Sequence, residues 1–244
     1  MPKLHIYKNE KETCNAFAEW FVQLVNDTLK TADLFTIVLS AGEIPKPFYK
    51  LISADFIDKI DWTKIHIFSG DESLVTFSDA KGSSNNSEGV FFETFPLSPA
   101  HIHTINKNMP PEEAARNYEE LLRTFFNHSS STFNLAILGL GEDGNTLSLF
   151  PGNDENNDSS NWVIPIYNTK EDLYKISLTA PVINASAVKA FLITGKRKQE
   201  AVENVLKGKY QPEKYTAQLI QTVNKTVHWF LDEAAAGKLI KPTL

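Results

Sequence analysis

The sequence lacks the features that mark disulfide-rich, metal-binding or membrane-spanning proteins. Only one of its 244 residues is a cysteine, Cys14, which excludes an internal disulfide and offers no metal-ligand spacing. We expect Cys14 to be a small buried apolar residue on a helix. No segment approaches the roughly 20 apolar residues that a membrane-spanning helix requires. The first residues also lack the apolar run of a signal peptide, so we expect a cytoplasmic protein with no membrane partner.

A basic surface is missing as well. The 24 lysines and arginines are outnumbered by 30 aspartates and glutamates, which gives a formal net charge of -6. Because no basic stripe appears, we expect no nucleic-acid partner. An anionic substrate would need positive charge gathered locally, since the overall field does not attract it. The six histidines are not spaced with carboxylates as metal ligands, and we interpret His101 and His103 as surface residues of a strand or loop.

What the sequence does contain is an alternation of short apolar runs and longer helical patterns. The runs cover residues 35–39, 65–68, 135–139, 176–178 and 190–193. This order predicts repeated βαβ units, and therefore an α/β fold with a mostly parallel sheet. The length and the hydrophobic content of 42% fit one domain over residues 1–244.

Apolar residues at helical spacing predict four helices. The first begins at Asn9, with Glu12 three residues later in a capping-box pattern. The second opens at Pro111, and the third runs over about 198–206. The fourth is expected to contain four apolar residues at its core-facing positions, Val223, Val227, Phe230 and Leu231.

Ligands of open parallel sheets bind outside the carboxyl ends of the strands, so the residues after each run are candidates for a site. After the first run, the small residues Ala41 and Gly42 lead into a helix that we expect to start at Pro45. Its free backbone N–H groups suit an anion. Glu43 lies inside this turn, where its carboxylate either repels a phosphate or caps the helix.

Three further loops carry candidate residues. Asp71 and Glu72 follow the second run, and we expect one of them to be functional. The third run leads into the glycine-rich segment 139–152, where Asp143 is either a base or hydrogen-bond acceptor, or a helix cap. The last run is followed by three cations at a predicted helix start, Lys196, Arg197 and Lys198. Positive charge at this end of a helix is unfavourable unless an anion offsets it. The three residues therefore form either an anion site or a solvated basic patch.

Taken in order, these loops resemble the 6-phosphogluconolactonase family, the lactonase branch of a superfamily that includes glucosamine-6-phosphate deaminase. The most specific match is the Ser148–Pro151 ending of the third loop, which resembles the end of the family pattern G-x-G-x-D-G-H-T-A-S-L-F-P. The resemblance covers nearly the whole chain. The matching segments are 39–49, 71–73, 84–85, 139–151, 179–184, 195–198 and 229–235.

The resemblance implies a Rossmann-like, three-layer α/β/α fold of the NagB/RpiA type. It also implies hydrolysis of 6-phospho-D-glucono-1,5-lactone to 6-phosphogluconate without a metal or cofactor. The small-molecule partner would be a sugar phosphate or sugar lactone, and we expect a monomer or small homo-oligomer. Such chemistry needs a base that activates water, donors for the developing oxyanion and cations for the phosphate.

Several positions depart from the family pattern. The histidine position is Asn145, whose amide accepts no proton at neutral pH. The arginine position is Ser73, which offers no charge, and the turn at 41–44 carries Glu43 where the family has hydroxyl residues. The positions that still match are the acidic and glycine residues of the second and third loops and one cation: Asp71, Glu72, Asp143, Gly144 and Lys198.

Three hypotheses follow from this pattern. The first is an active lactonase that uses Asp143 or Glu72 as base and the cations at 196–198 for the phosphate. The second is a re-specialised enzyme that acts on a different sugar or lactone. The third is a non-catalytic sugar-binding or interaction protein that keeps the fold. The replaced positions favour the second and third, whereas the resemblance over the whole chain favours the first.

Overall fold

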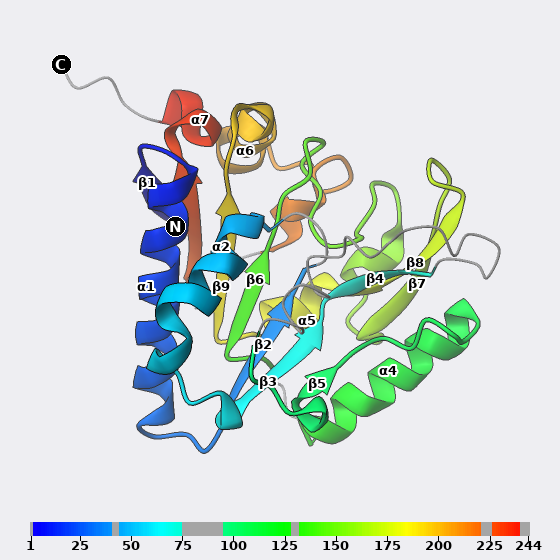
Figure 1. Cartoon of the computed structure of the whole chain (residues 1–244). Helices are drawn as coiled ribbons and strands as arrows, with labels where there is room; N and C mark the ends of the chain where they lie inside the picture. Colours follow the sequence, from blue (N-terminus) through cyan, green and yellow to red (C-terminus); the bar gives the residue numbers. More distant parts are fainter. Residues whose placement is uncertain (1, 41–43, 75–94, 128–131, 221–225, 240–244) are drawn as a thin grey trace.

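In the part of the chain that the structure describes, seven parallel strands form the large sheet (Figure 1). The computed structural model of the chain describes residues 2–40, 44–74, 95–127, 132–220 and 226–239. The strands, in their spatial order, are β1 (Lys3–Tyr7), β10 (Val227–Asp232), β9 (Val188–Ile193), β6 (Leu135–Leu138), β2 (Phe35–Leu39), β3 (Ile65–Ser69) and β5 (Ile102–His103). All neighbouring pairs are parallel, as the alternating pattern predicted.

A second, smaller sheet is antiparallel and was not predicted. It consists of β4 (Asp71–Leu74), β8 (Leu173–Leu178) and β7 (Val163–Asn168), in the order β4-β8-β7. The run 176–178 therefore belongs to this sheet rather than to the parallel one. Asp71 and Glu72 lie on a strand and not in a loop, because β4 follows β3 almost directly and pairs with β8.

The helices largely follow the predicted pattern. The helices are α1 (Glu10–Leu29), α2 (Lys46–Leu51), α4 (Pro111–Phe125), α5 (Ala180–Asn184), α6 (Gln199–Lys207) and α7 (Glu233–Ala236). Asn9 caps α1 as expected, since its side chain accepts from the backbone N–H of Glu12 and donates to the Glu12 carboxylate. Pro45 stands at the N-cap of α2, so the helix begins at Lys46, one residue after the expected start.

One predicted helix is wrong, because β10 occupies most of its residues. Phe230 packs in one apolar cluster, while Trp229 and Leu231 pack in the other, so both faces of this segment are buried. A short apolar run covered on both faces lacks the alternation that distinguishes a strand from a helix. The fourth member of the predicted helix, Val223, lies outside the described residues.

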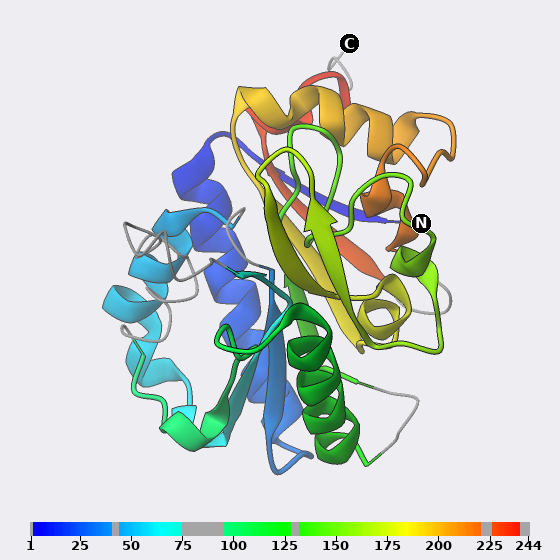
Figure 2. The same ribbon diagram turned by 90° about the vertical axis from the view of Figure 1, so that its right-hand side faces the viewer.

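The large sheet is covered on both faces, which gives the three-layer arrangement that the resemblance implied. On one face, Phe17 of α1 and Phe48 of α2 pack in one apolar cluster with sheet residues such as Ile37 of β2. On the other face, side chains of α4, α6 and the small sheet pack in a second apolar cluster with Phe191 of β9 and Leu138 of β6. Figure 2 shows α4 and the β7–β8 hairpin on this second face. Single-domain organisation remains our interpretation of this shared packing.

Cys14 is buried on α1, as predicted, and burial raises the pKa of its thiol to about 12. His101 and His103 are partly exposed at the edge of the large sheet, and their rings also make packing contacts. His103 Nε2 lies 3.0 Å from His66 Nδ1, and the His103 ring stacks on Phe68. Nδ1 of His101 is buried. The pairing of β5 with β3 places His103 directly opposite Phe68.

A second histidine pair lies at the opposite edge of the large sheet. His5 Nε2 is 3.1 Å from His228 Nδ1, and both rings stack near Phe230. Burial lowers the pKa of His228 and of His103 to about 4, with further lowering by the neighbouring histidines. Across the described residues, side chains form no group of three that could hold a metal ion. None of the described helices has the length and apolar character needed to cross a bilayer.

Candidate active site

The loop after β6 forms a compact turn at the carboxyl end of the large sheet. The Gly141 N–H donates to the Asn145 carbonyl at 2.7 Å, and the Thr146 hydroxyl donates to the Gly139 carbonyl at 2.8 Å. Gly144 has a φ of 82°, and a Cβ at this position would lie 2.6 Å from Cδ1 of Tyr215. Both its backbone conformation and the close approach of Tyr215 therefore require glycine.

Within this turn, Asp143 and Asn145 are hydrogen-bonded to each other. The Asn145 backbone N–H donates to Asp143 Oδ1 at 3.2 Å, and its side-chain Nδ2 donates to Oδ2 at 2.8 Å. Asp143 is exposed, whereas Asn145 is only 7% exposed. The asparagine therefore fixes an acceptor-only carboxylate at a position that water can reach.

Asn145 is itself held by a segment that the sequence analysis did not identify. Its Oδ1 lies 3.3 Å from the Thr216 hydroxyl, which also lies 2.7 Å from the Leu149 carbonyl. The Ala217 N–H donates to the Gly144 carbonyl at 3.2 Å. Residues 215–217 thus cover the turn, and their proximity arises from tertiary folding rather than from a sequence motif.

Asp71 connects the small sheet to the same loop. It is 5% exposed, and Ser148 donates its hydroxyl to Asp71 Oδ2 at 2.6 Å. A hydroxyl bonded to a buried carboxylate is a short, strong type of hydrogen bond. The structure therefore brings the second and third predicted loops together at one position.

Glu72 and Ser73 point to different faces of β4, because side chains alternate along a strand. Glu72 is 3% exposed and forms an ion pair with Lys107 at 2.6 Å. Ser73 shares the face of Asp71, which is the face directed to the third loop. The two adjacent carboxylates do not meet in one site, and Lys107 is a partner that carried no recognisable sequence signal.

The three residues of the predicted cationic cluster form a short 3₁₀ turn, Lys196–Lys198, directly before α6. Arg197 Nε lies 2.8 Å from Glu142 Oε1, which joins the cluster to the third loop. Lys196 bonds to the side chain of Gln199. The ion pair of Arg197 and Glu142 is 84% and 49% exposed, so it contributes little stability and can exchange partners.

The backbone N–H at the start of this turn already has a carboxylate partner. Gly195, with a φ of 95°, donates to both oxygens of Asp232 at 3.0 Å. Asp232 also accepts from the Ala235 N–H at 2.7 Å and is 5% exposed. An anion at this cluster would therefore meet the side-chain cations rather than the Gly195 N–H.

Three predicted site residues cannot be placed. Ala41, Gly42 and Glu43 lie outside the described residues, as does the segment 84–85. On either side of the turn, Ser40 donates its N–H to the Ile137 carbonyl at 3.0 Å, and Ile44 is buried. The alternatives for Glu43 stay open.

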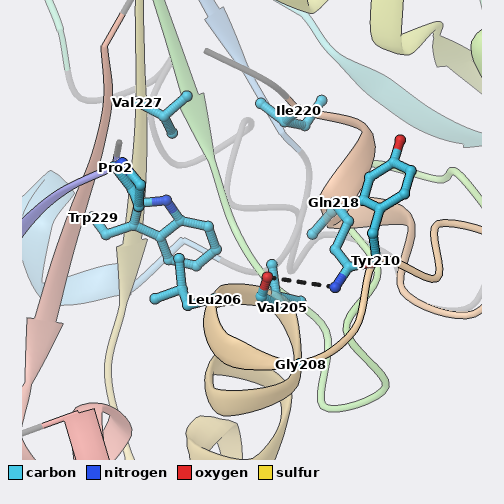
Figure 3. A pocket seen from close by; sticks show the side chains of 10 residues that line it. Pro2, Val205, Leu206, Gly208, Tyr210, Gln218, Ile220, Val227 and Trp229 are labelled. Atoms are coloured by element: carbon cyan, nitrogen blue, oxygen red, sulfur yellow. Dashed lines mark hydrogen bonds between the residues drawn. The ribbon is translucent and has the colours of Figure 1, made fainter.

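A cavity of about 430 Å³ lies elsewhere in the molecule (Figure 3). It is lined by side chains from the end of α6 and the start of β10, including Leu206, Val227 and Trp229. The cavity lies at the start of β10, and Ala217 of the segment that covers the turn also lines it. It contains none of the predicted site residues.

Comparison with known proteins places the chain in a family. The family model described as "Glucosamine-6-phosphate isomerases/6-phosphogluconolactonase" matches residues 8–229. The chain is 34% identical to 6-phosphogluconolactonase 3, chloroplastic, of Arabidopsis thaliana, over 97% of this chain and 75% of that protein. It is 32% identical to the 6-phosphogluconolactonase of Synechocystis, over 85% of each chain.

Solved structures agree with these matches. The crystal structure of 6-phosphogluconolactonase from Thermotoga maritima superposes with a TM-score of 0.78 at 26% identity, over 95% of this chain and all of that one. A monomeric glucosamine-6-phosphate deaminase, at 18% identity and a TM-score of 0.76, shares the fold. The chain belongs to the glucosamine-6-phosphate isomerase/6-phosphogluconolactonase family, as its loop residues predicted.

Proposed function

We propose that the chain hydrolyses 6-phospho-D-glucono-1,5-lactone to 6-phosphogluconate, the reaction of the pentose phosphate pathway. The relatives named 6-phosphogluconolactonase match over nearly the whole chain, which supports a carboxylic ester hydrolase of this kind. The observation that carries the proposal is the fixed pair of Asp143 and Asn145 beside the Asp71–Ser148 bond.

In this proposal Asp143 is the general base. Water adds to the lactone carbonyl carbon as its proton passes to the Asp143 carboxylate. The bond from that carbon to the ring oxygen then breaks, and the ring oxygen takes the proton back from Asp143. The carboxylic acid that results releases its remaining proton to water and becomes the carboxylate product. Asn145 acts as a positioning residue, because its amide donates to Asp143 and cannot itself take the proton.

The other predicted residues have secondary roles in the proposal. Glu72 is a poor candidate for the base, since it faces away from the third loop and is paired with Lys107. The cations at 196–198 are proposed to attract the phosphate, with Arg197 leaving its exposed partner Glu142 when substrate binds. Gly144 lets the turn close tightly beneath Tyr215.

The test follows hydrolysis of the lactone generated in situ, measured against its spontaneous decay. We expect Asp143→Asn to lower kcat by about 10²–10⁴, because the amide cannot accept the proton. Asp154→Asn is the matched control, since Asp154 is an exposed carboxylate on a different turn and its loss should leave the rate unchanged.

Two results would contradict the proposal at different points. A native rate no faster than spontaneous decay would refute the function. A native rate above background that Asp143→Asn leaves intact would refute the role of Asp143 alone. The cytoplasmic location and the monomeric or small homo-oligomeric state stay predictions, which cell fractionation and light scattering would check.

A further inference from the structure

We propose that Lys175 supplies the phosphate-binding cation that position 73 lacks. This inference rests on the proposed function and names a specificity-determining residue of the same site. In the family pattern an arginine stands where this chain has Ser73. A cation is still present in this part of the fold, because Lys175 lies on β8, the strand next to β4.

The strand register places the two residues side by side. β4 and β8 are antiparallel, with Ser73 directly opposite Lys175 and Asp71 directly opposite Ser177. Residues opposite each other in such a pair project to the same face, with Cβ atoms about 4.5–5.5 Å apart. Lys175 therefore shares the face of Ser73 and Asp71, and this is the face that meets Ser148.

The position of the ammonium group agrees with this register. Lys175 Nζ lies 5.8 Å from the ring centroid of Phe150, which belongs to the third loop just after Ser148. On the other side of β8, the buried Ile166 of β7 is directly opposite Lys175. The charge thus stands beside apolar side chains, where solvent screens it less than on an open surface.

The present partner of Lys175 is one that a phosphate can replace. Nζ lies 2.9 Å from Glu171 Oε2, and the side chains are 18% and 52% exposed. An ion pair whose carboxylate is exposed contributes little to stability. A phosphate with its two negative charges would compete successfully for the ammonium group. Lys107, by contrast, is paired with Glu72 on the opposite face of β4.

The experiment compares a phosphorylated substrate with an unphosphorylated one. Lys175→Met keeps most of the aliphatic stem and removes the charge. We expect KM for 6-phosphogluconolactone to rise about 10- to 100-fold, since a charge-assisted contact is lost, with kcat nearly unchanged. Hydrolysis of glucono-1,5-lactone should not change. Lys175→Arg should retain a low KM, and Lys170→Ala, an exposed lysine in the same hairpin, should behave as the native chain.

A rescue completes the test. Ser73→Arg added to Lys175→Met returns the charge from the opposite strand, and KM should recover most of its loss. An active native enzyme whose KM is unchanged by Lys175→Met would overturn the inference and leave the proposed function standing. An equal loss with both lactones would also overturn it, since that result indicates a structural role. A native chain that neither hydrolyses the lactone nor binds 6-phosphogluconate overturns both.

Discussion

The two sheets of this molecule use their side chains differently. In the large sheet, every residue of β2 and β6 is buried, and helices or the small sheet cover both faces. In the small sheet, β4 directs Asp71 and Ser73 to one face and Glu72 to the other, each with polar or charged neighbours. The large sheet holds the loops in place, and the small sheet brings Asp71 and Lys175 beside the third loop.

This difference has a physical basis. A charge in a strand buried on both faces carries a large desolvation cost, and the central strands β2 and β6 accordingly hold no charged side chain. The small sheet has an open end at its hairpin, where Tyr167 and Tyr174 are exposed and Lys175 is half-buried. Changes of substrate preference in this fold are therefore expected in the small sheet and the loops, and changes of stability in the large sheet.

The largest expected effect is on the large sheet. Phe191 is fully buried, and its ring stacks on Trp229 with centroids 4.1 Å apart. Phe191→Ala should lower the free energy of unfolding by about 3–5 kcal/mol, because it leaves a cavity. Urea denaturation measures this loss, and kcat per folded molecule should be unchanged. If Phe191→Ala instead kept the native free energy of unfolding and lowered kcat, the large sheet would act on catalysis rather than on stability, contrary to this comparison.

An intermediate effect is expected where the small sheet meets the third loop. Ser148→Ala removes the hydroxyl that donates to the buried Asp71 and should cost about 1–3 kcal/mol in the free energy of unfolding. It should also lower kcat, in contrast to Phe191→Ala. Ser160→Ala is the matched control, because Ser160 makes a similar bond to Asp158 at 2.7 Å on the exposed surface. That variant should stay within about 0.5 kcal/mol of the native chain.

The smallest effect, counted per pH unit, concerns the histidine pairs at the two edges of the large sheet. His103 and His228 have pKa values lowered to about 4, so between pH 6.5 and 4 the unfolded chain binds more protons than the folded one. Their contribution to stability is therefore complete above pH 6.5 and is lost as the pH falls toward 4. Each histidine adds at most about 1.4 kcal/mol per pH unit to the slope.

Urea midpoints measured between pH 4.5 and 7.5 check this slope. His103→Phe combined with His228→Phe should flatten it while keeping the aromatic packing on Phe68 and Phe230. If the double variant loses stability with falling pH as steeply as the native chain, the carboxylates rather than these histidines set the acid limit.

Much of the large sheet was predictable from the sequence because burial on both faces leaves a plain apolar run. The same property misled the prediction at β10, where residues 227–231 also fit a helical spacing. The small sheet was missed because Asp71, Ser73 and Lys175 interrupt the apolar pattern of its strands. Pro165 further obscures β7, since proline within a run argues against a strand, although an edge strand such as β7 tolerates it.

The candidate site was predictable where its residues belong to a continuous motif. The turn at 139–152 was identified from its glycines and the Ser148–Pro151 ending. Thr216, Lys107 and Lys175 were not, because contacts between distant segments place them beside the motif. The roles proposed for the residues of the site stay predictions until the variants are measured.

The burial of Cys14 has a practical consequence for these measurements. The only thiol of the chain is 2% exposed and has a pKa near 12, so it is almost entirely unreactive at neutral pH. A cysteine introduced at an exposed position would then be the sole site of labelling. A fluorophore attached at the tip of the β7–β8 hairpin would report binding at the small sheet without any need to replace the native residue.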